Sequence, residues 1–393
     1  MSRVSKRLGR LPGSATLAIS NRARELRAEG RDVISFGAGE PDFPTPEHIV
    51  AAAARAAGDP ASHHYTANVG LPLLRSAIVG YTADFSKVAV DETQILVTNG
   101  AKQAIFETFA ALLDPGDEVL LPAPHWVTYP AGIELAGAVP VTVPSVMADG
   151  FKVTVDDLER HRSDKTKMLV FVSPSNPTGA VYTADEARAI GEWATERDIW
   201  VMADEIYQRL VYGSEEVAPS ISAVTPGLEN VVLINGVAKS FAMTGWRVGW
   251  MIGPADVVAA AGRYQSHATG NVNNVAQIAA SEALTGPQDT VEAMREAFAK
   301  RRQTMLSMLA EAPGISCAEP SGAFYVFPSV AELLGERYPT AEALAEGLLE
   351  EAGIAVVPGG SFGAPGFIRL SYALSDSELE RGVTRMLDMF GRI

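Results

Sequence analysis

The stretch QILVTNGAKQAIFETFAALL, residues 94–113, combines an apolar run, a short turn of small residues and a helix-like segment. The run QILVT lacks the alternation of polar and apolar residues that marks a half-exposed strand, so it predicts a strand buried on both faces. The segment AKQAIFETFAALL that follows is long enough to be a crossover helix. A buried strand followed directly by a helix is the repeating unit of a parallel α/β sheet.

The same pattern recurs toward the carboxyl terminus. Helix-like stretches separate several of the later apolar runs, for example TADEARAIGEWATERD at residues 183–198. We therefore predict an α/β domain with a mostly parallel central sheet. The runs that predict its further strands are EVLLP (118–122), MLVFV (168–172), IWVMA (199–203) and VVLIN (231–235).

The pattern changes after GPQD at residues 286–289. A long helix with polar patterning is expected there, followed by shorter helices and strands, which together are typical of a smaller α+β domain. We predict a large domain over residues 48–285 and a small domain formed by residues 1–47 with residues 286–393. The segments on which the small domain rests are GAFYVFP (322–328), EALAEGLLEEAG (342–353), IAVVP (354–358) and FIRLSY (367–372).

Composition excludes several classes of protein. The chain of 393 residues is 47% hydrophobic and carries a formal net charge of −15, so its surface should repel nucleic acid and anionic membranes. The only cysteine is Cys317, which excludes an internal disulfide and suits a reducing compartment. No apolar run is long enough to span a bilayer, and the amino terminus lacks the apolar block of a signal peptide. We expect a soluble, cytoplasmic protein that binds neither nucleic acid nor membrane.

Polar residues follow two of the predicted strands. Asn99, Gly100, Ala101 and Lys102 open a helix, so free backbone N–H groups and the helix dipole could bind a phosphate there. The alternative is an ordinary strand-to-helix turn. After MLVFV, the rigid turn SPSNPTG could direct Asn176 into a cleft, or it could simply be a turn. Open α/β sheets bind their ligands at these carboxyl ends.

Charged residues follow two further strands. Asp204 ends the apolar run IWVMA, so it is either a helix N-cap or a buried anion that needs a cation. Lys239 follows VVLIN within a segment of small and aromatic residues, and Arg247 comes eight residues later. A partly desolvated lysine near other cations becomes a nucleophilic amine, although a surface position is the alternative. The set contains an amine nucleophile, an anion clamp and a buried carboxylate, which are the groups that pyridoxal phosphate requires.

The segment AKSFAMTGWRVG at residues 238–249 is the most specific part of a wider resemblance. The chain closely resembles the class I aminotransferases of fold type I, in the branch that contains bacterial aspartate and aspartate/prephenate aminotransferases. The likeness covers nearly the whole chain, from SATLAISNRARELRAEGRDVISFGAGEPDFPTP at its start to IAVVPGGSFG near its end. The implied fold is that of the fold type I pyridoxal-phosphate-dependent transferases, and the implied cofactor is pyridoxal 5′-phosphate.

The resemblance implies roles around the cofactor ring. Lys239 would be the Schiff-base lysine and would act as the general base, and Asp204 would pair with the pyridine nitrogen. Tyr207 and Asn176 would hydrogen-bond the ring hydroxyl, and Trp126 would stack on the ring. Lys239, Asp204 and Tyr207 are therefore the expected catalytic residues of a ping-pong transamination.

The resemblance also implies a phosphate site. Backbone donors of Gly100, Ala101 and Lys102 would hold the phosphate together with the side chain of Arg247. Tyr65 would reach the same phosphate from a second subunit, which implies a homodimer with shared active sites.

For the substrate, the resemblance implies an amino acid and a 2-oxo acid. Arg369 looks like the bidentate clamp on the α-carboxylate, which a planar guanidinium can form. Gly39 would let the backbone lie against the substrate, and Trp126 and Asn176 would line its site. Lys102 would bind the distal carboxylate of aspartate or glutamate, although a solvent-facing helix lysine is the alternative.

Some sequence patterns point to other functions. GGSFG at residues 359–363 fits the G-x-S-x-G pattern of serine hydrolases, but that motif requires a following helix, which the sequence does not predict here. The histidines do not have the spacing of metal ligands, so no metal is expected. A different specificity (aromatic, prephenate or specialised substrates), a pyridoxal-phosphate-dependent lyase and a pyridoxal-phosphate-sensing regulator are the alternatives. Three departures from the family pattern put substrate choice in doubt: Ala238, His125 and residues 266–277.

Overall fold

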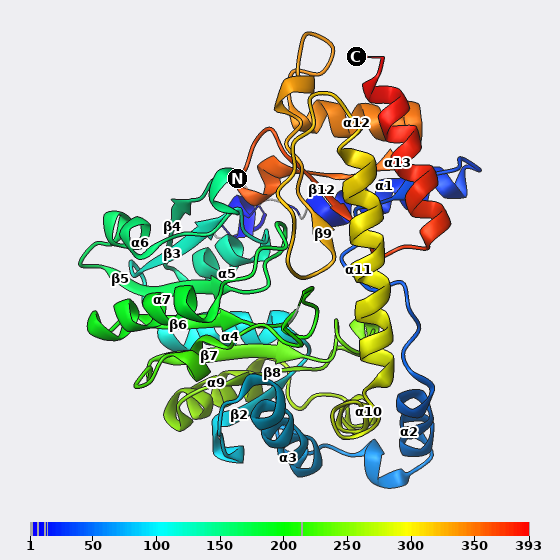
Figure 1. Cartoon of the computed structure of the whole chain (residues 1–393). Helices are drawn as coiled ribbons and strands as arrows, with labels where there is room; N and C mark the ends of the chain where they lie inside the picture. Colours follow the sequence, from blue (N-terminus) through cyan, green and yellow to red (C-terminus); the bar gives the residue numbers. More distant parts are fainter. Residues whose placement is uncertain (1–2, 6–7, 12, 14, 214, 393) are drawn as a thin grey trace.

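The computed structural model describes the whole chain except residues 1–2, 6–7, 12, 14, 214 and 393. A layered region built on one large sheet occupies the lower part of Figure 1, and a smaller region stands above it. The long helix α11 (Asp289–Leu309) runs from the lower region into the upper one.

The large sheet has seven strands in the order β2-β8-β7-β6-β5-β3-β4. Only β8 runs against its neighbours, so the prediction of a mostly parallel sheet is confirmed. The five strands predicted for the large domain are all strands of this sheet. The strands are β2 (Ile95–Thr98), β3 (Glu118–Ala123), β4 (Val139–Pro144), β5 (Thr166–Val172), β6 (Trp200–Asp204), β7 (Val231–Gly236) and β8 (Gly249–Ile252).

Two of these strands are absent from the sequence prediction. The strand β4 contains Pro140 and ends at Pro144, and proline is tolerated there because β4 is an edge strand with one side unpaired. The strand β8 is short, and it begins at Gly249, the last residue of the segment AKSFAMTGWRVG. Its pairing with both β2 and β7 is a long-range contact that local sequence does not reveal.

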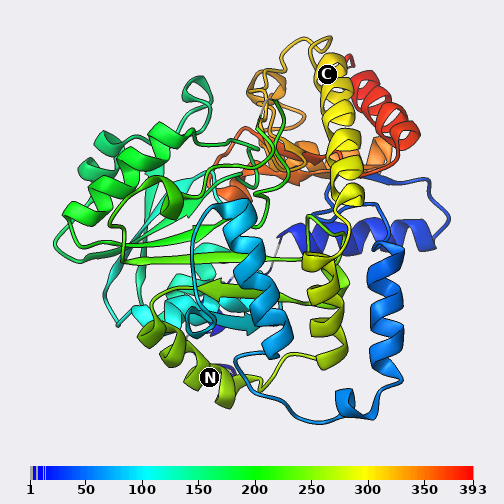
Figure 2. The same cartoon turned by 60° about the horizontal axis from the view of Figure 1, so that its bottom comes forward.

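Both faces of the sheet are covered, which explains why the strands are apolar throughout. Along β2, Ile95 and Val97 join the apolar core on one face, while Leu96 joins the core on the other. On the first face, α3 packs against β2 and α7 packs against β6. Figure 2 shows α3, α10 and α2 side by side, with α10 between the other two. The second face is covered by α4, α5 and α9. The helices of this region are α2 (Glu47–Ala57), α3 (Pro72–Tyr81), α4 (Ala101–Leu112), α5 (Thr128–Ala136), α6 (Val155–His161), α7 (Ala184–Glu196), α8 (Ile221–Val224), α9 (Ala255–Ala268) and α10 (Asn274–Thr285).

The smaller region joins the two ends of the chain. The strand β1 (Ile34–Ser35) pairs in parallel with β10 (Ile354–Ala355), so the amino-terminal segment lies against the carboxyl-terminal part. A second small sheet has the order β11-β12-β9, so the predicted single strand IAVVP contributes to two different sheets. The domain boundaries themselves stay predictions. The remaining elements are β9 (Tyr325–Val326), β11 (Val357–Pro358), β12 (Ile368–Ser371), α1 (Ala15–Ala28), α12 (Ala341–Ala352) and α13 (Asp376–Phe390).

Among the described residues, no helix is both long and apolar enough to cross a lipid bilayer.

Candidate active site

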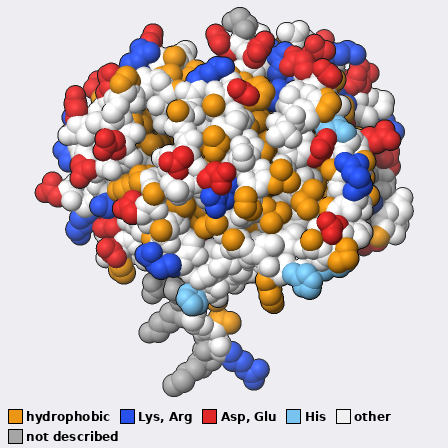
Figure 3. Space-filling view, turned by 90° about the horizontal axis from the view of Figure 1, so that it is seen from below, with side chains coloured by type: hydrophobic (Ala, Val, Ile, Leu, Met, Phe, Trp, Pro, Cys, Tyr) orange, Lys and Arg blue, Asp and Glu red, His pale blue; other side chains and the backbone are white. Residues whose placement is uncertain are grey.

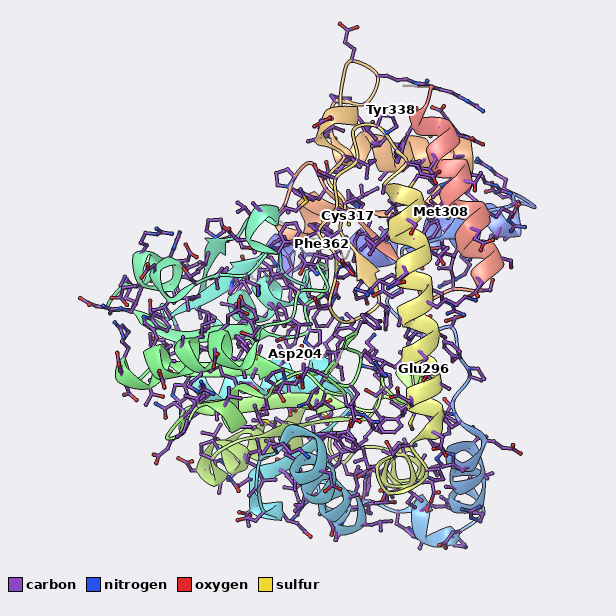
Figure 4. The ribbon with its side chains drawn as sticks, viewed as in Figure 1. Asp204, Glu296, Met308, Cys317, Tyr338 and Phe362 are labelled. Carbon is purple, nitrogen blue, oxygen red and sulfur yellow. The ribbon has the colours of Figure 1, made fainter. Side chains whose placement is uncertain are left out.

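A cavity of about 860 Å³ opens between the carboxyl edge of the large sheet and the smaller region. Asp204 marks its position in Figure 4, at the end of β6 and below the smaller region. Residues that are far apart in the sequence meet here because the parallel strands all end at this edge. The predicted site residues that line the cavity are Gly39, Ala101, Lys102, Trp126, Asn176, Asp204, Tyr207, Lys239, Arg247 and Arg369.

The turn between β2 and α4, residues 98–102, carries open backbone donors. Gly100 adopts φ +85°, a conformation that favours glycine, and its N–H donates to Thr98 O at 2.7 Å. Gly100 was predicted as a phosphate donor, but its N–H is already used within the turn. Within the described part of the chain, the N–H groups of Ala101 and Lys102 have no acceptor because they are the first two residues of α4. These two are the donors that could bind an anion.

Arg247 lies against this turn. Its Nη2 donates to Asn99 O at 3.2 Å and its Nη1 donates to Thr244 O at 3.0 Å. A Cβ atom added to Gly100 would lie 2.6 Å from Arg247 Nη2, so only glycine allows the guanidinium to approach this closely. The arrangement brings a cation beside two free N–H groups at a helix start, which is a typical anion site.

Asp204 is a buried carboxylate that is 3% exposed. Its Oδ2 accepts a hydrogen bond from the hydroxyl of Tyr129 at 2.8 Å, and its Oδ1 accepts one from the Ile206 N–H at 3.1 Å. Burial raises the pKa of Asp204, while these two donors oppose the rise. Tyr129 was not predicted as a site residue, because nothing in the sequence connects the start of α5 with the end of β6.

Lys239 is partly buried at the cavity, and its Nζ donates to the carbonyl of Gly39. Burial, and after it the charge of Arg369, lower the pKa of Lys239 to about 8. The rings of Tyr207 and Phe324 both have their centres 5.6 Å from the ammonium nitrogen. A substantial fraction of this amine is therefore neutral near physiological pH, which is the state a nucleophile or base requires.

Arg369 is 1% exposed and is held rigidly. Its Nη1 donates to Asn176 Oδ1 and its Nη2 donates to Gly37 O, both at 2.9 Å. Its guanidinium also lies over the ring of Tyr325, 4.5 Å from the ring centre. Its Nε has no partner among the described residues, so a buried donor remains available. Burial lowers the pKa of Arg369, which is expected for a cation without a carboxylate partner.

Asn176 and Tyr207 have protein partners in this structure. Asn176 Oδ1 accepts from Arg369, and its Nδ2 has no acceptor in the described chain. The hydroxyls of Tyr207 and Tyr325 are 2.9 Å apart. Tyr325 was not predicted as a site residue, because it stands in the apolar run GAFYVFP and its position is that of a core strand residue.

Lys102 and Trp126 form one wall of the cavity. The Nζ of Lys102 lies 4.9 Å from the centre of the Trp126 ring. Burial lowers the pKa of Lys102, and the nearby charge of Arg247 contributes to the same shift. Tyr65 lies outside the cavity and is 98% exposed. No group of three or more His, Cys, Asp or Glu side chains among the described residues could hold a metal ion.

Comparison with known proteins gives matches over nearly the whole chain. A family model described as aminotransferase class I and II matches residues 31–386. An aspartate aminotransferase of Streptomyces avermitilis is 55% identical, with 98% of this chain and 95% of that protein covered. An aspartate/prephenate aminotransferase of Cereibacter sphaeroides is 43% identical, with 98% of each chain covered. The crystal structure of an aspartate aminotransferase from Rhizobium meliloti superimposes with a TM-score of 0.95 at 36% identity and covers 100% of both chains.

Proposed function

Because the chain belongs to the class I and II aminotransferases, we propose that it transfers an amino group between aspartate or glutamate and a 2-oxo acid with pyridoxal 5′-phosphate. Transamination and the cofactor follow from the family. The choice of substrate and the role of each residue are our proposals. The observation that carries them is the partly buried amine of Lys239, with its pKa lowered to about 8, in the same cavity as Asp204 and Arg369.

The cavity fits the cofactor. The N–H groups of Ala101 and Lys102 and the guanidinium of Arg247 form an anion site that a phosphate group suits. Asp204 provides a buried carboxylate that needs a cation, and a protonated pyridine nitrogen is such a cation. Trp126 offers an aromatic face at the cavity wall. We assign the cofactor to these residues, with Asn176 and Tyr207 as hydrogen-bond partners for its ring.

When bound, pyridoxal 5′-phosphate supplies an electron sink for the carbanion formed at the substrate Cα. Lys239 would take the proton from this carbon at its Nζ, because the lowered pKa leaves a fraction of the amine neutral near physiological pH. The Gly39 carbonyl, which accepts from Nζ, would hold the amine in the cavity. The carboxylate of Asp204 would keep its cationic partner protonated, and the Tyr129 hydroxyl would orient that carboxylate.

Arg369 would bind the α-carboxylate of the substrate. Its contacts with Asn176, Gly37 and Tyr325 hold the guanidinium in place before a substrate arrives, so little side-chain entropy is lost on binding. Each Nη carries a second N–H beyond these contacts, so donors remain for a carboxylate. The backbone at Gly39 lies beside this position, and a Cβ there would lie 3.3 Å from the Tyr325 hydroxyl oxygen.

Lys102 supports a dicarboxylic substrate. Lys102 lies on the cavity wall and forms no ion pair with a carboxylate among the described residues. Burial and the charge of Arg247 lower its pKa, so an added anion would be favourable there. The relatives named aspartate aminotransferase agree with this assignment. Prephenate or an aromatic oxo acid is the second candidate, because one relative is named an aspartate/prephenate aminotransferase.

The substrate assignment is tested by half-reactions followed at the absorbance bands of the cofactor. Lys102→Met should lower kcat/KM for aspartate about tenfold or more, the factor that corresponds to one lost hydrogen bond between charged groups, and leave phenylalanine almost unaffected. Lys300→Met is the matched control, because it removes the same charge from a side chain that is 75% exposed on α11. An unchanged value for aspartate in Lys102→Met would remove the basis of the assignment.

We further propose a homodimer. Tyr65 is 98% exposed and would complete the phosphate site of the partner subunit. Figure 3 shows apolar side chains gathered near the middle of the face seen from below, where a second copy could dock. Exposed apolar side chains on the large region include Val50, Leu73 and Tyr264. Sedimentation should give twice the mass of the chain, and an active monomer would contradict the proposal.

The single cysteine, Cys317, suits a reducing compartment, and we propose the cytoplasm as the location of the protein. Fractionation of cells followed by immunodetection would test this.

A further inference from the structure

A buried carboxylate lies behind the turn of residues 98–102 and takes no part in the chemistry described above. Glu107 is on α4, is 1% exposed, and does not line the cavity. Its Oε1 accepts a hydrogen bond from Gln103 Nε2 at 2.6 Å, and its Oε2 has no partner among the described residues. An acidic group buried in this way is costly, so its presence requires an explanation.

Gln103 connects Glu107 with the turn. Its Oε1 accepts from both the backbone N–H and the side-chain Nδ2 of Asn99, at 2.7 and 2.8 Å. Its Nε2 donates to Glu107 and also to Thr269 Oγ1 at 2.9 Å. The carbonyl of Asn99 in turn accepts from Arg247. A continuous chain of hydrogen bonds therefore runs from Glu107 through Gln103 and Asn99 to the cation of the anion site.

Glu107 is the nearest of three acceptors that set which way the Gln103 amide faces; the others are Thr269 Oγ1 at 2.9 Å and Gln265 Oε1 at 3.4 Å. An amide side chain can be rotated by half a turn with little change in shape, which exchanges its donor and its acceptor. A carboxylate only accepts, so Glu107 requires the NH₂ of Gln103 on its side and leaves the carbonyl oxygen for Asn99. In the reversed orientation, the NH₂ group would face the N–H of Asn99, and the turn would lose both of these hydrogen bonds.

Burial raises the pKa of Glu107 to about 7, while the hydrogen bond from Gln103 opposes the rise. Both protonation states leave one oxygen able to accept from Gln103, so the orientation of the amide is the same in each.

We propose that Glu107 and Gln103 are positioning residues that fix the turn of residues 98–102 for binding the phosphate group of the cofactor. Gln103 satisfies Asn99 and thereby leaves the N–H groups of Ala101 and Lys102 directed at the cavity. This inference rests on the proposed function, because it assigns the phosphate of pyridoxal 5′-phosphate to this turn. It predicts that Glu107 affects a ligand with a phosphate and not the same ligand without one.

The test compares pyridoxal 5′-phosphate with pyridoxal, which has the same aldehyde and ring but no phosphate. Each is titrated into the cofactor-free protein and followed by absorbance. Glu107→Met should weaken pyridoxal 5′-phosphate binding about tenfold, the factor for one lost hydrogen bond to a charged group, and leave pyridoxal binding unchanged. Glu107→Gln should stay close to the wild type, because its side-chain oxygen can still accept from Gln103. Thr108→Val is the matched control on α4, since the Thr108 hydroxyl is buried and bonds only to Ala104 O, at 2.8 Å.

If Glu107→Met folds poorly, the double variant Gln103→Leu/Glu107→Leu removes both polar partners together, which avoids an unpaired buried carboxylate. It should show the same selective loss. An equal loss for both ligands, no loss for either, or a Glu107→Gln variant as weak as Glu107→Met would overturn the inference. A wild-type protein that binds neither ligand would instead contradict the proposed function, so the two failures are distinguishable.

Discussion

Replacing Tyr129 with phenylalanine would test how the buried carboxylate at the centre of the site is held. The substitution removes the hydroxyl that donates to Asp204 Oδ2 at 2.8 Å and keeps the ring, which packs edge-on against Trp126 at 5.5 Å. Tyr129 is 2% exposed and Asp204 is 3% exposed, so water does not replace the lost donor. A hydrogen bond to a charged group contributes about 1.5–3 kcal/mol, and kcat/KM should therefore fall roughly tenfold to a hundredfold.

The same change has a predictable effect on the pH profile. Burial already raises the pKa of Asp204, and the Tyr129 hydroxyl opposes this rise. Without the hydroxyl the pKa rises further, so Asp204 takes up its proton at a higher pH and stops supporting a cationic partner there. The acid limb of kcat/KM should move toward higher pH in Tyr129→Phe.

The assay is the half-reaction with aspartate, measured in single turnovers across the pH range. Tyr338→Phe is a matched control, because the Tyr338 hydroxyl also donates to a carboxylate, Glu351 Oε1, at 2.6 Å. Figure 4 places Tyr338 at the far end of the smaller region from Asp204. A Tyr129→Phe enzyme with the rate and the acid limb of the wild type would refute the reasoning.

Three further outcomes are expected. Lys239→Ala should gain no mass when it is treated with the cofactor and borohydride, whereas the wild type should retain the cofactor covalently; labelling of the variant would show that another amine is used. Arg369→Lys should raise KM for every amino acid on the order of a hundredfold, because lysine lacks the planar fork that Asn176 and Gly37 hold in place, and a KM unchanged in steady-state assays would contradict this. The rate at which the cofactor-free protein combines with pyridoxal 5′-phosphate should rise with pH through about 8, because the neutral amine of Lys239 increases there; a flat profile in stopped-flow absorbance would be inconsistent with this pKa.

Local sequence was sufficient for the strands that are buried on both faces. Ile95 to Val97 are apolar without interruption because α4 and α9 cover this strand on one face of the sheet and α3 covers it on the other. It was not sufficient for β4, which is a proline-containing edge strand, or for β8, whose pairing with β2 and β7 joins residues far apart in the sequence.

The candidate site likewise contains residues that the sequence could identify and residues that only the structure reveals. Lys239, Asp204 and Arg247 could be selected from the sequence, because each follows a recognisable apolar strand and lies in a segment that resembles a known family. Tyr129 and Tyr325 could not be selected from the sequence. Each belongs to the site only because its side chain contacts a site residue that is distant in the sequence: Asp204 for Tyr129, and Tyr207 and Arg369 for Tyr325. Gly100 as a phosphate donor stays a prediction; in this structure its N–H bonds to Thr98 O, and its lack of a side chain lets Arg247 approach closely.

The sequence by itself therefore determined the class of fold, the lysine proposed to bind the cofactor and the order of the polar residues that follow the strands, because hydrophobic patterns and motifs depend on neighbouring residues. Only the tertiary structure decided which of these residues touch. Arg369 meets Gly37 and Asn176 because the smaller region folds both ends of the chain over the edge of the large sheet. Contacts of this kind join residues hundreds of positions apart, and they arise from packing, which local patterns do not specify.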